Sequence, residues 1–326
     1  MRINLFVYPS YNRLAQENVP EYKYHLPLND TVLFSQGPVR LVSSPDDADF
    51  FYMGQFGDAN GDYLSQPLDE YLNQFPYLRN CPERHIFQKD GDWVGQEQSE
   101  WFHYEVPDFF KQCIIITHNW KRSWVAPNVY VYPRESRPLL SLMYRYDEFP
   151  NEGLSMSYRS EFDNWDIGYR LTKAADYAST YIDYISKEPL SNVEPHDTRV
   201  KEHFDHLKDH PVAICAQGNR FDSTQFFEAC FFGRVPILVS EGVLPGEDMY
   251  DTSFAYQLTP ALPSTIMSIQ LDAIAESFTP EVMKARSKAA RRYFEHIIRP
   301  QMHDPTGEFI YFLQRRNLIK GFRHPR

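Results

Sequence analysis

The chain is short of positive charge. Its 326 residues contain 33 Lys and Arg against 44 Asp and Glu, which gives a formal net charge of −11. Binding to nucleic-acid phosphates needs a concentrated surplus of cations, so this composition argues against a nucleic-acid partner. We expect ligands that are neutral, or that are anionic only where a local basic pocket meets them.

Cysteines and long apolar runs are also scarce. The four cysteines show no CxxC pairing, and at least three lie in apolar surroundings, which predicts buried thiols in a reducing compartment rather than disulfides or zinc ligands: Cys81, Cys113, Cys215 and Cys230. The first residues, "RINLFVYPS", resemble a strand and lack the apolar length of a signal peptide. No later stretch is long enough to span a bilayer. We therefore expect a soluble, cytoplasmic protein without an integral membrane segment.

The chain does contain recurrent apolar runs rich in β-branched and aromatic residues. Such continuous runs are typical of strands covered on both faces of a parallel sheet. In the first half they predict strands over 3–8, 39–44, 48–54, 84–88 and 112–117, with a helix at 67–75. An α/β layered fold follows, and the length of the chain favours two domains.

The pattern restarts after about residue 138. We predict a strand at 139–144, a long helix around 166–187, a charged helix near 197–208, strands at 212–215 and 254–258, and helices at 280–298 and 306–317. The apolar face of the long helix indicates a second core.

Residues 221–241, "FDSTQFFEACFFGRVPILVSE", predict a loop, a short helix, a stop at Gly233 and a buried strand. Asp222 or Ser223 can cap the helix, and its first turn offers N–H groups and the positive end of the helix dipole to a phosphate. Glu228 lies at i+4 from Thr224, where a carboxylate can bind ribose hydroxyls. The alternative is an ordinary capped helix whose one acid points to solvent.

The same stretch resembles the nucleotide-sugar half of exostosin-type (family 47-like) glycosyltransferases. The matching residues are Gly218, Arg220, Ser223, Glu228, Ala229, Gly233, Pro236, 237–240, Leu244 and Pro245. Upstream, "ADFFYMG" and "RHIFQKDGDW" form a second block that is similar to the family, with His85, Phe87, Asp92 and Trp93 at the family spacing. The two blocks cover about a third of the chain.

The resemblance implies a GT-B type fold with two Rossmann-like domains facing across a cleft. Residues 1–136 would form the acceptor-binding domain and 137–304 the donor-binding domain, with residues 305–326 packing back on the first. The implied activity is inverting transfer from a nucleotide-diphosphate sugar, UDP- or GDP-linked, to a hydroxyl of a glycan or glycoprotein acceptor. Neither a cofactor nor a metal is expected.

The resemblance also assigns roles to single residues. Gly218, Arg220, Ser223, Thr224 and Glu228 would bind the donor. The chain departs from the family at Gln217 and Gln225, where arginine is frequent, and at Gly91, where histidine precedes the Asp. Because fewer cations would then face the diphosphate, we expect Arg145 to assist Arg220.

The catalytic base of an inverting transfer should be an acid or a histidine of the first domain. Asp92 is the first candidate and Asp90 the second, with Trp93 beside them as an acceptor contact. The alternative is that "KDGD" is only a turn, since Asp and Gly favour turns.

Three short patterns raise the question of a metal. "DAD" (47–49) and "DGD" (90–92) match the Asp-x-Asp pattern of metal-dependent glycosyltransferases. Asp49 precedes its apolar run and is expected to begin a strand, whereas "DGD" keeps the metal-dependent alternative open. His203, His206 and His210 can share one helical side, for which we predict a solvated, charged helix face.

Two further functions remain open. A non-catalytic relative that binds glycan or a partner is compatible with Gln217, Gln225 and Gly91. A nucleotide-dependent oxidoreductase is disfavoured, because no G-x-G-x-x-G follows the first strand.

Overall fold

The computed structural model describes residues 3–8, 39–55, 72–73, 75–88, 108–117, 120–133, 155–160, 165–186, 198–217 and 223–319. The chain forms two compact units. The first comprises Met1–Asn119, Ser123–Tyr132 and His303–Arg326, and the second comprises Trp120–Arg122 and Pro133–Met302. The boundary predicted after residue 136 falls among residues that are not described.

The first unit is built on a parallel sheet whose strands lie in the order β2-β1-β3-β4-β5-β6. The strands are β1 Ile3–Val7, β2 Val39–Val42, β3 Phe50–Gln55, β4 His85–Gln88, β5 Ile114–Thr117 and β6 Val129–Val131. Short 3-10 helices precede three of them: η2 Pro45–Asp47, η3 Pro82–Arg84 and η5 Phe110–Gln112. The five strands predicted in this half are confirmed, and β6 is an additional one.

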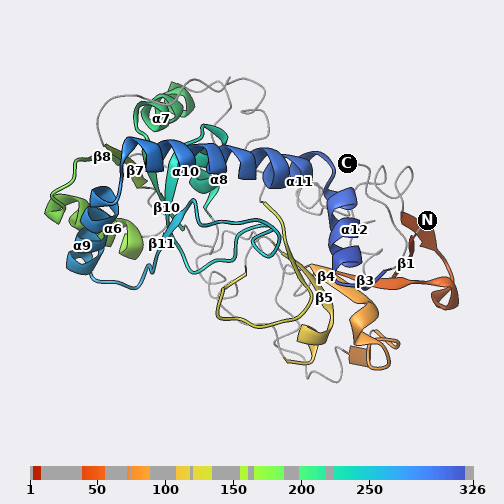
Figure 1. Cartoon of the computed structure of the whole chain (residues 1–326). Helices are drawn as coiled ribbons and strands as arrows, with labels where there is room; N and C mark the ends of the chain where they lie inside the picture. The colour runs from red at the N-terminus through yellow and green to blue at the C-terminus, as the bar shows by residue number, and fades with distance from the viewer. Residues whose placement is uncertain are drawn as a thin grey trace. The chain divides into compact units, whose positions relative to one another are not determined.

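One face of this sheet is covered by the last helix, α12 Pro305–Arg315 (Figure 1). Phe309, Ile310, Phe312 and Leu313 of α12 are buried in one cluster with Ile3, Leu5, Phe50, Ile86, Ile114 and Ile116 of the strands. The predicted return of the C-terminal helix to the first domain is therefore confirmed.

The second unit contains another parallel sheet, in the order β11-β10-β9-β7-β8. Its strands are β7 Met156–Ser160, β8 Ile182–Ser186, β9 Val212–Ala216, β10 Val235–Val239 and β11 Tyr256–Leu258. Its helices are α6 Trp165–Tyr177, α7 Thr198–Asp209, α8 Thr224–Phe231, α9 Ser264–Glu276, α10 Pro280–Tyr293, the π-helix η7 Phe294–Ile298, and α11 Arg299–His303.

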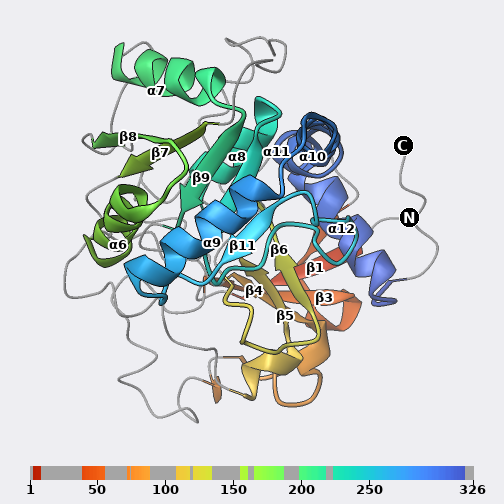
Figure 2. The ribbon, with the colours of Figure 1, turned by 60° about the vertical axis from the view of Figure 1, so that its left-hand side comes forward.

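Helices cover both faces of the second sheet (Figure 2). Successive strand residues point to opposite faces, so β9 contributes to two cores. Val212 and Ile214 pack in one cluster with α6 and α9, while Ala213 and Cys215 pack in another with α8 and α10. Because both faces of β9 and β10 are buried, neither strand has a polar face.

The predicted long helix over 166–187 is wrong. The structure has α6 ending at Tyr177, a turn, and then strand β8 from Ile182. The turn is fixed from α9, where the Asp272 carboxylate accepts hydrogen bonds from the backbone N–H groups of Ser179 (3.0 Å) and Thr180 (2.9 Å). A tertiary contact thus ends a helix that its apolar periodicity alone would continue.

The other predictions in the second half agree with the structure where it is described. The charged helix is α7, the strands at 212–215 and 254–258 are β9 and β11, and the helix at 280–298 is α10 continued by η7. The strand predicted at 139–144 and most of the helix predicted at 67–75 lie outside the described residues, although Leu72 and Phe75 are buried.

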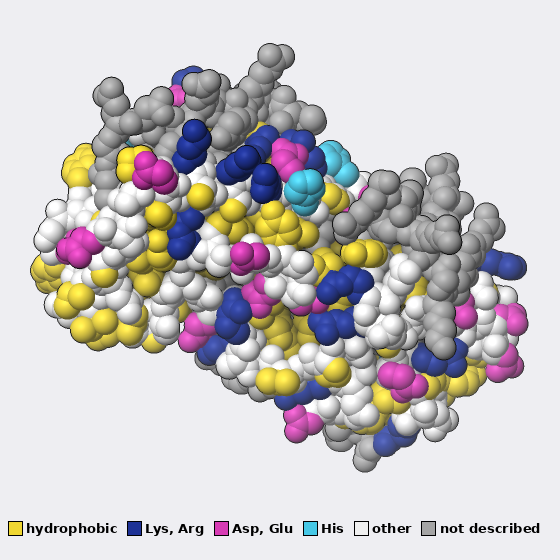
Figure 3. All heavy atoms as spheres, in the orientation of Figure 1, with side chains coloured by type: hydrophobic (Ala, Val, Ile, Leu, Met, Phe, Trp, Pro, Cys, Tyr) yellow, Lys and Arg dark blue, Asp and Glu magenta, His cyan; other side chains and the backbone are white. Residues whose placement is uncertain are grey.

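Two Rossmann-like units with a returning C-terminal helix confirm the predicted α/β class and fit the GT-B type of fold. The surface of the second unit includes apolar side chains on and beside α6 and α9, and Figure 3 shows hydrophobic side chains gathered at that end. Among the described residues, no helix has both the length and the apolar character that crossing a bilayer requires.

Candidate functional site

The strand order of the second sheet indicates where on the sheet a ligand would bind. The chain first adds β8 on one side of β7 and then crosses to the other side for β9. In parallel sheets of this kind, ligands bind outside the carboxyl ends of the strands where the order reverses. The carboxyl end of β9 and the start of α8 lie at such a reversal, and residues 218–222 between them are outside the described residues.

Gln217, the first residue after β9, has a structural role. Its side chain is buried, its backbone N–H donates to Val239 O (3.0 Å), and its Oε1 accepts from the backbone N–H of Glu241 (3.0 Å). These bonds tie the ends of β9 and β10 together. Position 217 therefore supplies no positive charge to the site, because glutamine is neutral, and its side-chain oxygen is engaged within the fold.

Ser223 stands at the N-terminus of α8 in an extended conformation, with φ −139° and ψ 118°. It occupies the N-cap position that the sequence predicts for it or Asp222, but its hydroxyl makes no capping hydrogen bond. The Ser223 Oγ is buried and has no hydrogen-bond partner among the described residues. Unpaired buried hydroxyls are costly, so this oxygen is suited to pairing with a ligand or with a residue of the neighbouring loop.

Glu228, one turn further along α8, is buried and paired. His203 of α7 places its Nε2 at 2.8 Å from Glu228 Oε2, and the two side chains are only 5% and 10% exposed. Among the described residues, His203 is the one that bonds this carboxylate. Thr224, which the sequence places on the same face, is half-buried.

The solvated face predicted for the three histidines, two of which lie on α7 while His210 directly follows it, is wrong. His203 and His210 are buried, and the side chain of His206 is only 9% exposed. The reason is that Phe204 and Leu207 of the same helix pack into the core against α8, which turns the histidines inward as well. Phe204 and Phe232 have ring centroids 5.4 Å apart.

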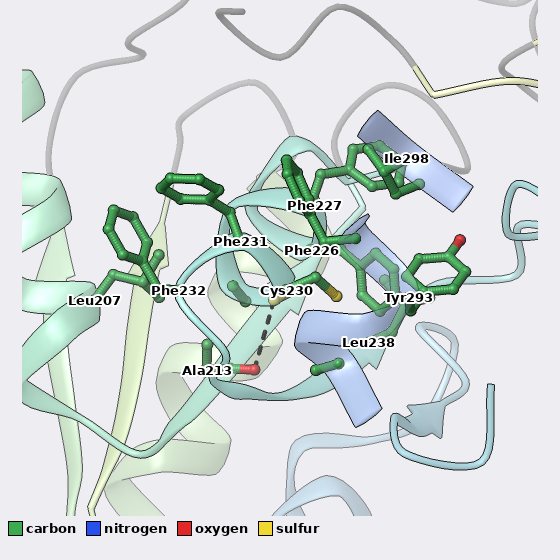
Figure 4. Packing of buried hydrophobic residues seen from close by; sticks show 14 of the residues in the cluster. Leu207, Ala213, Phe226, Phe227, Cys230, Phe231, Phe232, Leu238, Tyr293 and Ile298 are labelled. Atoms are coloured by element: carbon green, nitrogen blue, oxygen red, sulfur yellow. Dashed lines mark hydrogen bonds between the residues drawn. The ribbon is translucent and has the colours of Figure 1, made fainter. Parts of the chain in front are cut away.

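The remaining side chains of α8 serve packing, as predicted (Figure 4). Phe226, Phe227, Cys230 and Phe231 lie in one buried cluster with α10 and η7. Gly233 then adopts a φ of 64°, a left-handed conformation that suits glycine and ends the helix. Burial raises the pKa of the Cys215 and Cys230 thiols, and all four cysteines are free, which confirms the prediction of unpaired thiols.

A second group of polar side chains lies beside α7. Asp183 of β8 places Oδ2 at 3.1 Å from His210 Nε2 and at 3.3 Å from His206 Nε2. The imidazole rings of His206 and His210 have centroids 4.9 Å apart. Burial, and then the neighbouring His210, lower the pKa of His206, so its ring is kept neutral.

In the first unit, two residues of the sequence motifs have structural roles. His85 is fully buried, with Nε2 at 2.8 Å from the Tyr8 hydroxyl and Nδ1 at 2.8 Å from Cys81 O. Burial lowers the pKa of His85 to about 4. The Asp49 carboxylate accepts from the backbone N–H of Asn4 (2.7 Å) just before β3, as expected of a residue that begins a strand.

Six predicted site residues lie outside the described residues and stay predictions: Asp90, Asp92, Trp93, Arg145, Gly218 and Arg220. The structure brings Ser223, Thr224 and Glu228 together on α8. Sequence analysis missed His203 as the partner of Glu228 and Asp183 as the partner of two histidines. The available signal was the alternation of histidines with Phe204 and Leu207, which places them on the buried side of α7.

The chain matches no model of a known protein family and no curated protein. It is similar to solved structures at low identity. A glycosyltransferase from Rickettsia africae has 10% identity and a TM-score of 0.42, over 96% of this chain and 99% of that one. An α1,3-fucosyltransferase has 10% identity and a TM-score of 0.40, over 100% and 93%. MurG of Acinetobacter baumannii has 8% identity and a TM-score of 0.36, over 90% and 95%. Likenesses of this strength carry no argument about activity.

Proposed function

We propose that the protein is a glycosyltransferase that uses a nucleotide-diphosphate sugar. The observation that carries this proposal is the position of α8: it follows β9 at the reversal of strand order, begins at a buried hydroxyl without a described partner, and carries a buried carboxylate one turn later. This arrangement suits a diphosphate at the helix start and a pentose beyond it. The exostosin-type motifs of the same stretch support the assignment.

The donor would be bound by α8 and the loop before it. The backbone N–H groups of the first turn, the Ser223 and Thr224 hydroxyls and the Arg220 guanidinium would stabilise the diphosphate, with Gly218 allowing the close approach of the backbone. His203 holds Oε2 of Glu228, so Oε1 is the oxygen assigned to a ribose hydroxyl.

The transfer itself would be inverting and independent of a metal. The acceptor hydroxyl loses its proton to the carboxylate of Asp92, or of Asp90, as its oxygen attacks the anomeric carbon. The bond from that carbon to the diphosphate breaks, and the leaving group takes the electron pair. Arg220 and Arg145 would stabilise the charge that develops on the diphosphate, and Trp93 would contact the acceptor.

A thermal-shift series tests the donor site. A nucleoside diphosphate at a hundredfold its dissociation constant should stabilise the fold by about 2.7 kcal/mol. We expect UDP or GDP to raise the melting temperature in the presence of EDTA, and NAD to have no effect. A response to NAD alone would contradict the proposal, and a diphosphate response that requires Mn²⁺ would favour the Asp-x-Asp alternative.

Glu228→Gln tests the ribose assignment while keeping an acceptor for His203. Hydrogen bonds to a charged group contribute about 1.5–3 kcal/mol, so we expect the affinity for the nucleoside diphosphate to fall about tenfold to a hundredfold. Glu276→Gln, at an exposed acid of α9, is the matched control and should bind normally. Equal affinities in the two variants would remove Glu228 from the site.

A non-catalytic relative that binds glycan or a partner is the second candidate, because Gln217 is engaged in the fold and supplies no cation. Release of nucleoside diphosphate from a panel of activated sugars separates the two. A transferase should show turnover that Asp92→Asn lowers by orders of magnitude without loss of donor binding. Donor binding without any turnover would favour the non-catalytic protein.

A further inference from the structure

Three side chains of the second unit converge outside the proposed donor site. His206 lies in the last turn of α7, His210 directly follows that helix, and Asp183 lies on β8. Figures 1 and 2 show α7 and β8, the edge strand of the sheet. One ligand atom from each of the three lies within 4.8 Å of the others. Two imidazoles and one carboxylate are a common ligand set of divalent transition metals.

We propose that Asp183, His206 and His210 bind one divalent transition-metal ion, for which Zn²⁺ is the best fit. Zinc bonds to nitrogen and oxygen of about 2.0–2.1 Å place the ligand atoms of a tetrahedral site about 3.3 Å apart. The observed separations of Asp183 Oδ2 from the two Nε2 atoms are 3.1 and 3.3 Å. Two edges of the tetrahedron are therefore already formed.

The buried Nε2 of His206, which makes no hydrogen bond, is a second observation that points to a ligand. Its Nε2 is buried, and although it lies 3.3 Å from Asp183 Oδ2, the contact is not aligned as a hydrogen bond. A buried ring nitrogen without a hydrogen bond is costly unless something else occupies it. A metal ion that accepts the lone pair of Nε2 removes that cost.

The surroundings of the three side chains also suit a metal ion. Ser155 places its Oγ at 2.8 Å from His210 Nδ1, so the hydroxyl can accept the Nδ1 proton and leave Nε2 as the ligand atom. Such an outer hydrogen bond is usual for metal-binding histidines. The Asp183 side chain is 40% exposed, which leaves the fourth position open to water from the solvent side.

The ion would fasten α7 to β8. The same helix also carries His203, whose Nε2 binds the Glu228 carboxylate of α8. The proposed ion would therefore help to fix the helix that positions this carboxylate. The proposal does not depend on the donor site, because it rests on three residues that the transfer reaction does not use.

The experiment measures metal binding directly on the full-length chain without a histidine tag. After dialysis against a chelator, Zn²⁺ is titrated by isothermal calorimetry, and Co²⁺ binding is followed by its visible absorption. We expect one ion per chain and an increase in melting temperature that EDTA reverses. His206→Ala/His210→Ala should abolish both signals.

Two further variants keep the result interpretable. Asp183→Asn alters a partly exposed side chain and should preserve the fold while weakening Zn²⁺ binding by at least about tenfold, and Ser155→Ala should weaken it by about tenfold or more. His296→Ala, an exposed histidine of η7, is the control and should bind like the unaltered chain. Zinc binding that is absent from the folded chain, or that is equal in Asp183→Asn, in the double variant and in the control, overturns the proposal.

Discussion

At the scale of the residue, burial decides the charge of several side chains in this protein. His85 is the clearest case: its ring stacks on Phe51 with centroids 4.7 Å apart, and both of its nitrogens are hydrogen-bonded in the core of the first unit. A protonated ring in this place would be desolvated and would lie near the Arg84 cation, so the neutral form is favoured.

This burial predicts a loss of stability in mild acid. The pKa of His85 is about 4 in the folded chain and 6.5 for a histidine exposed to water, so the unfolded chain binds more protons between these values. The contribution of His85 is complete above pH 6.5 and declines as the pH falls toward 4. From pH 7 to pH 5 the loss is on the order of 2 kcal/mol.

Urea unfolding at pH 7 and pH 5 measures the effect. His85→Gln removes the titrating ring, so the drop in the free energy of unfolding should be smaller in the variant by about that amount, even if the variant is less stable at both pH values. Equal drops in the two proteins would show that His85 is not the group responsible.

At the scale of the element, the sequence predicts best where one strand or helix is covered on all sides. β5 and β10 are runs of apolar residues and were predicted, whereas β7 was not, because the buried Ser157 interrupts its apolar pattern. The Ser157 hydroxyl donates to Val212 O (3.3 Å) and is thereby satisfied in the core. β8 was predicted as helix because Asp272, which fixes the preceding turn, is distant in the sequence.

The same distinction applies to the site. Ser223, Thr224 and Glu228 were predicted because they lie on one short helix whose spacing is visible in the sequence. His203 pairs with Glu228, which is 25 residues away in the sequence. Asp183 contacts His210 and His206, which are 27 and 23 residues away. Only the folded chain brings these partners together. Local periodicity can place the histidines on the buried side of α7, but it contains no signal for which residues they meet there.

A turn in the connection between β10 and β11 depends on a glycine. Gly246 has a φ of 65°, and a Cβ at this position would lie 2.8 Å from Ile297 Cγ2. Gly246→Ala should therefore combine backbone strain with a steric clash and lower the free energy of unfolding by about 2 kcal/mol or more. Chemical denaturation measures the loss.

A double-mutant cycle separates the two causes. Ile297→Ala removes the methyl group that a new Cβ would meet, so Gly246→Ala should cost less in the Ile297→Ala background than in the unaltered chain. Strictly additive losses would mean that the strain at positive φ accounts for the whole effect.

At the scale of the whole molecule, each unit has its own core and a substitution in one should not weaken the other. Ile310 of α12 is completely buried in the core of the first unit. Ile310→Ala should cost about 2–5 kcal/mol, because it leaves a cavity between α12 and the sheet.

Hydrogen exchange followed by mass spectrometry locates the damage. Peptides from β1, β3, β4 and β5 should exchange faster in Ile310→Ala, while those from β9 and β10 should keep their protection, since their core contains no residue of α12. Faster exchange across both sheets would instead mean that the two units unfold as one.

The return of α12 to the first sheet also has a consequence for how the chain is made. A ribosome releases the strands of the first unit early, but the helix that covers one of their faces leaves the exit tunnel only after the second unit has been translated. Until then Ile3, Leu5 and Ile86 lack the α12 side chains that pack with them in the folded chain, so we expect a chaperone to recognise this face during synthesis.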